Sequence, residues 1–152
     1  MFEVLPAKTI VHIEDIVAVY VDEDFLLGND GAEKVIVYNV YVVTRNFKTR
    51  FFSDISAAQD FPTENDARDF LKNFIAQHAA LGCLTFFPSG NAINISYIEH
   101  IYSFGYKETY EIKAGVGSEP VYIYLAKGNI EDYEDTLNNI CQTMNAIAYG
   151  LR

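Results

Sequence analysis

The stretch VHIEDIVAV at residues 11–19 has a counterpart in INISYIEHI at residues 93–101. Apolar residues occupy the first, third, sixth and ninth positions of both stretches, which lie 82 residues apart. Each stretch leads into strand-like sequence and then into one amphipathic segment. The first two apolar residues are two positions apart, as on one face of a strand, but the next follows after three. This change in spacing predicts a turn or bulge near residues 14–15 and near residues 96–97.

The two amphipathic segments also match each other, at a spacing of 66 residues. The corresponding positions are Asp66, Asp69, Leu71, Asn73 and Phe74 in the first segment and Asp132, Asp135, Leu137, Asn139 and Ile140 in the second. We therefore predict an α+β fold in a single domain, residues 1–152. Two similar repeats of a β-meander plus a helix, about residues 9–82 and 91–150, would form antiparallel sheets with two helices packed on one face.

The first repeat contains the most apolar strand. Residues 35–43 are apolar on both strand faces except at Asn39, which predicts a central strand or a strand at an interface. Residues 22–34 are acidic and carry glycines, so we expect a loop there. Residues 47–52 indicate a further strand, after a turn at Arg45 and Asn46. The extra length of this repeat would lie in the 22–34 loop and in the connection at residues 53–62.

The second repeat has clearer alternation. In residues 106–114, Tyr110, Ile112 and Ala114 fall on one face and charged residues on the other, which is typical of a half-exposed antiparallel strand. In residues 121–125 the aliphatic side chains point one way and the tyrosines the other. A short strand at residues 84–87 and a turn at residues 88–91 precede this repeat.

Capping residues place the two helices. Thr63 with Asp66 predicts the start of the first helix, and Gly82 its end. Asn129 is expected to cap the second helix, whose first turns carry acidic residues, and Gly150 to end it. Its predicted buried stripe consists of Tyr133, Leu137, Ile140, Cys141, Met144 and Ile147.

Composition excludes several classes of protein. The net charge of −10 opposes binding to a phosphate backbone, so we expect no direct nucleic-acid binding. No segment is long and apolar enough for a membrane span, and the N-terminal sequence lacks the features of a signal peptide. Cys83 and Cys141 are isolated, which indicates reduced, buried thiols in a cytoplasmic protein.

Motifs for nucleotide binding, nucleophilic catalysis and zinc proteases are absent from the sequence. The acidic residues 22–24 with residues 29–31 lack the ligand spacing of an EF-hand, and we interpret them as a solvated loop. We therefore expect no cofactor and no metal site.

Histidines are the first candidates for catalysis. His12 and His100 lie in the matched stretches, close to Glu14 and Glu99, so these four residues are the candidate acid–base or ligand set. His12 and His100 do not occupy equivalent positions of the repeats. His78 falls on the apolar face of the first helix, where packing explains it.

Tyrosines indicate a contact surface. Several lie on predicted strands, and tyrosine is favoured where a surface is intermittently desolvated. The predicted interaction surface consists of Tyr38, Tyr41, Tyr102, Tyr122 and Tyr124.

One family resemblance covers about a third of the chain. The run IEDI at residues 13–16, followed by strands and by RFFSDI at residues 50–55, resembles the opening of a LytTR-type DNA-binding domain. The resemblance would imply DNA binding, which the acidic charge and the second repeat both oppose.

The sequence favours a non-enzymatic interaction or assembly protein, with a protein partner or self-association. Phage-encoded structural components and proteins that inhibit a host share this character, and a virion location would then apply. Two alternatives stay open. One is a small-ligand-binding module with a pocket between the halves, and the other is an enzyme with a His/Glu site from both halves.

Overall fold

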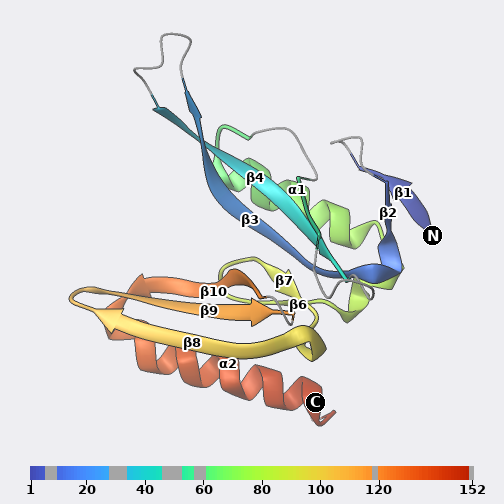
Figure 1. Cartoon of the computed structure of the whole chain (residues 1–152). Coiled ribbons are helices and arrows are strands. Elements are labelled where there is room, and N and C mark those ends of the chain that lie inside the picture. Colours follow the sequence, from blue (N-terminus) through green and yellow to red (C-terminus); the bar gives the residue numbers. More distant parts are fainter. Residues whose placement is uncertain (6–9, 28–33, 46–52, 57–60, 118–119, 151–152) are drawn as a thin grey trace. The chain divides into compact units, whose positions relative to one another are not determined.

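The computed structural model describes residues 1–5, 10–27, 34–45, 53–56, 61–117 and 120–150. The fold is α+β with antiparallel sheets and two helices, as the sequence predicts. The chain divides into two compact units, Met1–Leu84 (unit 1) and Thr85–Arg152 (unit 2) (Figure 1).

Unit 1 begins with a small hairpin and continues into a longer antiparallel meander. Strand β4 lies between β3 and β5, so the strand predicted to be central is central in this unit. The elements are β1 (Phe2–Val4), β2 (Ile10–His12), the 3-10 turn η1 (Ile13–Asp15), β3 (Ile16–Leu27), β4 (Lys34–Thr44), β5 (Ser53–Ser56), α1 (Glu64–Ala76) and the 3-10 turn η2 (Ala79–Cys83).

Unit 2 also contains a meander and one helix, but its second 3-10 turn precedes the helix, whereas that of unit 1 follows the helix. A short hairpin and a 3-10 turn precede a three-stranded antiparallel meander, in which β9 is central, and one helix follows. The elements are β6 (Thr85–Phe86), β7 (Ala92–Ile93), η3 (Ile95–Tyr97), β8 (Ile98–Tyr106), β9 (Thr109–Val116), β10 (Val121–Asn129), η4 (Ile130–Asp132) and α2 (Tyr133–Ala148).

The phase change in the two matched stretches corresponds to the turns η1 and η3. The Ile16 N–H donates to the Ile13 carbonyl in η1, and the Ile98 N–H donates to the Ile95 carbonyl in η3. The register then shifts once after each turn, at the start of β3 and at the start of β8. A single 3-10 turn followed by a bulge thus explains the apolar spacing in both stretches.

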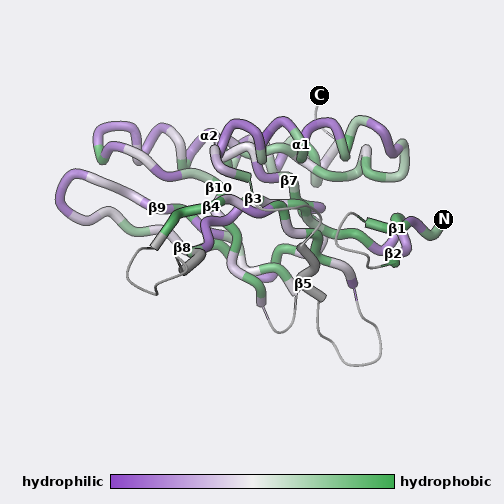
Figure 2. Tube along the Cα trace, turned by 90° about the horizontal axis from the view of Figure 1, so that it is seen from above, coloured by the Kyte–Doolittle hydropathy of each residue, from purple (hydrophilic) through white to green (hydrophobic). Residues whose placement is uncertain are grey.

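Helix α1 packs against β3 and β4 through one apolar face. Its buried residues are Ala67, Leu71, Phe74 and Ile75. The Thr63 hydroxyl accepts a hydrogen bond from the Asp66 N–H at 3.2 Å, so the predicted cap is confirmed. Figure 2 shows hydrophilic and hydrophobic residues alternating along α1 and along α2, as expected for helices with one packed face.

Helix α2 covers one face of the sheet of unit 2 (Figure 1). The rings of Tyr110 on β9 and Tyr133 on α2 stack at 5.3 Å between centroids. The Tyr133 hydroxyl donates to Ser103 Oγ at 2.7 Å. Tyr110, Ile112 and Ala114 are buried, while Glu111 and Lys113 between them are only half-buried, so the predicted alternation of this strand is confirmed.

The turn at residues 88–91 binds the outer edge of β10. Ser89 Oγ and Asn91 Nδ2 both donate to the Tyr124 carbonyl, at 2.8 and 2.9 Å. The Ser89 N–H donates to the Leu125 carbonyl at 2.8 Å, where the register of β10 shifts. Side-chain and main-chain donors therefore satisfy carbonyls at the irregular point of this strand.

Several predicted boundaries are wrong. Residues 53–56 form strand β5 rather than part of a connection, and residues 107–108 form the turn between β8 and β9 rather than part of one strand. Residues 22–27 belong to strand β3 rather than to a loop, because Phe25 and the following leucines continue the strand beyond the acidic residues. Helix α1 ends at Ala76, and Gly82 lies within η2. Asn129 precedes the 3-10 turn η4, and its side chain makes no capping bond. The predicted strand at residues 47–52 lies outside the described residues.

The burial predicted for the cysteines is wrong, and the stripe predicted for the last helix is only partly buried, with Tyr133, Leu137 and Met144 half-buried. Cys83 and Cys141 are both exposed. In the predicted stripe of α2 only Ile140 is fully buried, and Ile147 is 38% exposed.

Lys107 adopts a left-handed conformation in the turn between β8 and β9, with φ of 56°. This conformation costs a residue with a Cβ about 1–2 kcal/mol. Lys107→Gly would remove this cost, but glycine also has more conformational freedom in the unfolded chain, which offsets part of the gain. We expect a net rise in the free energy of unfolding of about 0.5–1 kcal/mol. Urea unfolding measures the change. Lys107→Ala is the control and should give no gain; a glycine variant no more stable than the alanine variant would contradict the assignment.

Candidate functional site

Three of the five predicted interface tyrosines share one surface. Tyr102 on β8 and Tyr122 and Tyr124 on β10 lie on the face of the unit 2 sheet opposite to α2. The residues that alternate with the two β10 tyrosines are buried, and Ser103 beside Tyr102 accepts a hydrogen bond from Tyr133 of α2. Tyr38 and Tyr41 lie in unit 1, on opposite faces of β4, and both are half-buried. These two residues therefore do not share a face with each other.

The register extends this surface beyond the tyrosines. Tyr102 and Tyr124 both stand opposite Lys113 on β9, and Phe104 and Lys127 both stand opposite Glu111. We call the whole set the aromatic face. It comprises His100, Tyr102, Phe104, Tyr106, Glu111, Lys113, Tyr122, Tyr124 and Lys127.

The rings of the aromatic face contact one another. Tyr122 meets His100 and Tyr102 edge-on, with centroids 5.6 and 5.7 Å apart. Tyr102 and Phe104 lie parallel at 6.4 Å. Tyr102 is 39% exposed, and Phe104 and Tyr122 are each 48% exposed. The rings are thus ordered by mutual contact while a large part of their surface still faces solvent.

Two ammonium groups converge on the ring of Tyr124. Lys113 Nζ lies 4.2 Å and Lys127 Nζ 5.0 Å from the ring centroid, within the range of cation–π attraction. The Tyr124 hydroxyl donates to Glu111 Oε1 at 3.0 Å. The centre of the face therefore combines one phenol, two cations and one carboxylate.

The protonation states at this centre follow from the surroundings. Burial lowers the pKa of Lys113, but the negative charges of Tyr124 and Tyr102 in their deprotonated forms, the hydrogen bond with Tyr124 and the Glu111 carboxylate together outweigh it and hold the pKa above its ordinary value. Burial and the hydrogen bond to Glu111 raise the pKa of Tyr124. At neutral pH Lys113 is therefore charged and Tyr124 is neutral.

Because Gly115 has no side chain, the imidazole ring of His100 on β8 can lie over the neighbouring strand β9. The two residues stand opposite each other in the register of β8 and β9. A Cβ built on Gly115 would lie 2.6 Å from Cε1 of the imidazole, which is closer than such atoms approach in proteins. The absence of a side chain on β9 thus gives His100 the space in which its ring meets Tyr122.

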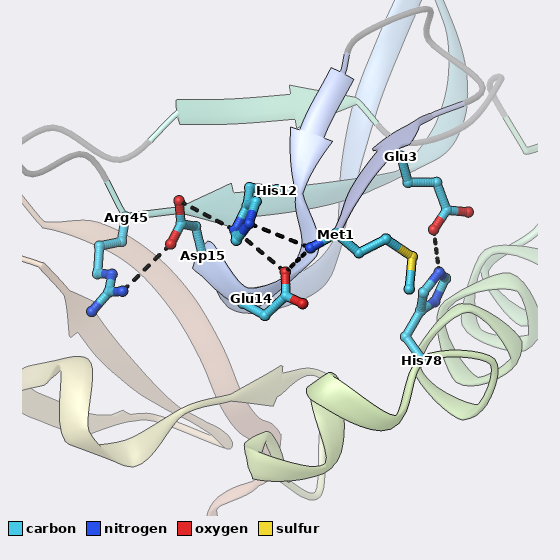
Figure 3. Close-up of polar contacts among 7 residues, drawn as sticks. All are labelled: Met1, Glu3, His12, Glu14, Asp15, Arg45 and His78. Carbon is cyan, nitrogen blue, oxygen red and sulfur yellow. Dashed lines mark hydrogen bonds and ion pairs between the residues drawn. The ribbon is translucent and has the colours of Figure 1, made fainter.

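The other predicted pair, His12 and Glu14, belongs to a polar cluster in unit 1 (Figure 3). His12 Nδ1 lies 3.3 Å from Glu14 Oε2 and 3.8 Å from Asp15 Oδ2. The Met1 amino group donates to Glu14 at 2.7 Å and lies 3.3 Å from His12 Nε2. The bond from this amino group lowers the pKa of Glu14. Arg45 contacts Asp15 at 3.4 Å on the outer side of the cluster.

The four candidate catalytic residues have different surroundings. His12 contacts Glu14 in unit 1, whereas His100 and Glu99 belong to unit 2. Glu99 is exposed at the register shift of β8, and the His100 ring takes part in the aromatic face. Among the described residues, no group of three or more His, Cys, Asp or Glu side chains is arranged to hold a metal ion.

His78 joins the end of α1 to the first strand, a role the sequence did not indicate. Its Nδ1 donates to the Phe74 carbonyl at 2.7 Å, and its Nε2 bonds the Glu3 carboxylate (Figure 3). Burial lowers the pKa of His78, but the carbonyl and the carboxylate together outweigh it and hold the pKa above its ordinary value. The His78–Glu3 pair therefore connects two distant segments of unit 1, and its attraction depends on the pH because the His78 imidazole must be protonated to carry charge.

This pair predicts a pH-dependent contribution to stability. Because the folded-state pKa of His78 is raised, its stabilisation is fully present below the unfolded pKa of about 6.5 and is lost as the pH rises through the folded pKa. We expect Glu3→Gln to reduce the free energy of unfolding at about pH 5.5 more than at about pH 8.5. Urea unfolding at both pH values measures this. Glu64→Gln, which removes a carboxylate paired with Arg68, is the control and should lack this pH dependence. An equal effect of Glu3→Gln at both pH values would contradict the raised pKa.

The space above Gly115 gives a second prediction. We expect Gly115→Ala to displace the His100 ring and to abolish the nuclear Overhauser contacts between the His100 and Tyr122 rings. Because the ring can swing toward solvent, the unfolding free energy should change by less than about 1 kcal/mol. Gly82→Ala is the matched control, since a Cβ there meets nothing within 4 Å. Persistence of the contacts between the His100 and Tyr122 rings in Gly115→Ala would contradict the close approach of the His100 ring to Gly115.

No described helix is both long and apolar enough to cross a membrane. No protein-family model, curated protein or solved structure matches the chain significantly.

Proposed function

We propose that this protein is a non-enzymatic interaction module and that the aromatic face of unit 2 is its binding surface for a protein partner. The observation that carries the proposal is the row of exposed rings on one side of a helix-backed sheet. Tyrosine and other aromatic residues contribute much of the binding energy at protein interfaces, because they bury a large area and keep a polar group.

The order already present in the face supports this function. Tyr122 is in edge contact with two rings, and Tyr102 is in contact with two. Each side chain that is ordered before binding avoids an entropy cost of about 0.5–1.5 kcal/mol at an interface. Such a surface binds with less loss of freedom than an equal number of separate exposed rings.

We also propose that the two units are copies of one ancestral unit. The support is the common order of a hairpin, a 3-10 turn, a meander and a helix, with a register shift at equivalent points of β3 and β8. Tyr20 lies 82 residues before Tyr102 and stacks on Tyr41 at 5.2 Å. Tyr20 is 7% exposed and Tyr102 is 39% exposed, so the copies would have diverged in how much of this tyrosine faces solvent.

A double substitution tests the binding surface. We expect Tyr102→Ser with Tyr122→Ser to weaken capture of the partner from the native host by at least about tenfold, because each ring removed from an interface centre costs about 1–2 kcal/mol or more. Affinity purification with quantitative mass spectrometry measures capture, and light scattering detects self-association. Phe25→Ser with Ile36→Ser is the matched control, since this cross-strand pair of unit 1 is also exposed.

The control pair should leave capture unchanged, and urea unfolding should show that both double variants remain folded. A partner that binds the Tyr102/Tyr122 variant as well as the unaltered chain would refute the proposal. A chain that stays monomeric and enriches no protein would refute it as well.

A further inference from the structure

We infer that the aromatic face recognises an acidic segment of its protein partner, with a carboxylate bound by Lys113 and Lys127 beside the ring of Tyr124. The inference rests on the proposed function and adds the chemistry of the partner. The aromatic rows on either side of this centre would pack against apolar or aromatic residues that flank the carboxylate.

The distribution of cations in unit 2 supports an anionic partner. Between residues 85 and 150 the only Lys or Arg residues are Lys107, Lys113 and Lys127. Each ammonium lies near a ring of the aromatic face, with Lys107 Nζ 5.2 Å from the Tyr106 ring centroid. All the described cations of this unit are thus associated with the one surface that carries the exposed rings.

Four of the seven described acidic residues of unit 2 lie next to or on α2, and the other three, Glu99, Glu108 and Glu111, lie on β8, β9 and the turn between them. Glu131 and Asp132 lie in η4, and Glu134 and Asp135 in the first turn of α2, where they favour the helix dipole. The helix covers the opposite face of the sheet from the lysines. The two sides of this sheet therefore differ in charge, within a chain whose net charge is −10.

The charges at the centre of the face are not balanced. Two ammonium groups meet one carboxylate, Glu111, which accepts a hydrogen bond from Tyr124. Among the described residues, neither Lys113 nor Lys127 has a carboxylate within the 4.0 Å of an ion pair. A carboxylate from a partner would supply the missing counter-charge and would form charge-assisted hydrogen bonds with the half-buried Lys113 and the exposed Lys127.

A short acidic peptide fits these charges better than a nucleic acid does. Single-stranded nucleic acids also stack on aromatic residues, but they require a basic groove that follows a long run of phosphates. Three lysines cannot neutralise such a run in an acidic chain, which would repel the polyanion at low salt. One or two carboxylates in a peptide need only the two lysines beside Tyr124.

Selection of peptides on the full chain tests the inference. Random peptides of about twelve residues are displayed and selected on the unaltered protein, and the most enriched sequences are synthesised for titration calorimetry. We expect them to contain Asp or Glu next to Tyr, Phe or Trp. Their affinity should fall at least about tenfold with Lys113→Met plus Lys127→Met, and at least about tenfold with Tyr102→Ser plus Tyr122→Ser. It should also fall as NaCl rises from about 0.05 to about 0.5 M.

Lys72→Met is the control for charge, because Lys72 is exposed on α1 in unit 1, and it should leave the affinity unchanged. Peptides that need the two tyrosines but are neutral or basic, and that bind the lysine variant equally, would overturn the inference and leave the proposed function standing. Failure to enrich any peptide that depends on the tyrosines would overturn both. Tighter binding of an oligothymidylate than of the acidic peptides would overturn the inference and identify single-stranded nucleic acid as the preferred ligand of the face.

Discussion

The packing of α2 against β9 determines the rest of unit 2. The stacked rings of Tyr110 and Tyr133 and the buried Ile112 and Ala114 fix which side of the central strand faces the helix. Because side chains alternate along a strand, the intervening residues Glu111, Lys113 and Gly115 must then face the other way. A shift of the register by one residue would bury Lys113 under the helix and would place Ile112 and Ala114 among the exposed rings. The chemistry of the aromatic face therefore depends on an apolar contact on the opposite side of the sheet.

Local patterns predicted the parts of this fold that local interactions determine. The alternation in β9, the Thr63 cap and the phase change at both 3-10 turns were all readable, because each depends on residues a few positions apart. The acidic start of the predicted loop, Asp22 to Asp24, misled the prediction, since side chains of a strand can be charged where they face solvent. The exposure of Cys141 was missed because helical periodicity shows which face is apolar but not which of its positions the sheet covers.

The sequence named some of the residues that form the aromatic face and missed others. Tyrosines on predicted strands indicated a contact surface, and three of the five named residues share a face. Phe104, Lys113 and Lys127 were missed, although the alternation from Tyr102 to Phe104 was visible in the sequence. Their association requires the pairing of three strands and the bulge in β10, which no single stretch of sequence specifies. Tyr38 and Tyr41 resemble the others in residue type, yet their half-burial in unit 1 follows from neighbours distant in sequence.

The bonds from Ser89 and Asn91 to the Tyr124 carbonyl have a consequence for how any other molecule can approach unit 2. A partner that extends a sheet must offer its main chain to free carbonyl and N–H groups along an edge strand. At the bulge of β10 those carbonyls already accept hydrogen bonds from the chain's own turn. The edge nearest Tyr124 is thus closed to strand addition there, and access to its ring is from above the plane of the sheet. The same hydrogen bonds hold the backbone of Tyr124 in place while its ring stays available for contact. The main chain of this residue therefore stabilises the fold, and its side chain forms part of the surface.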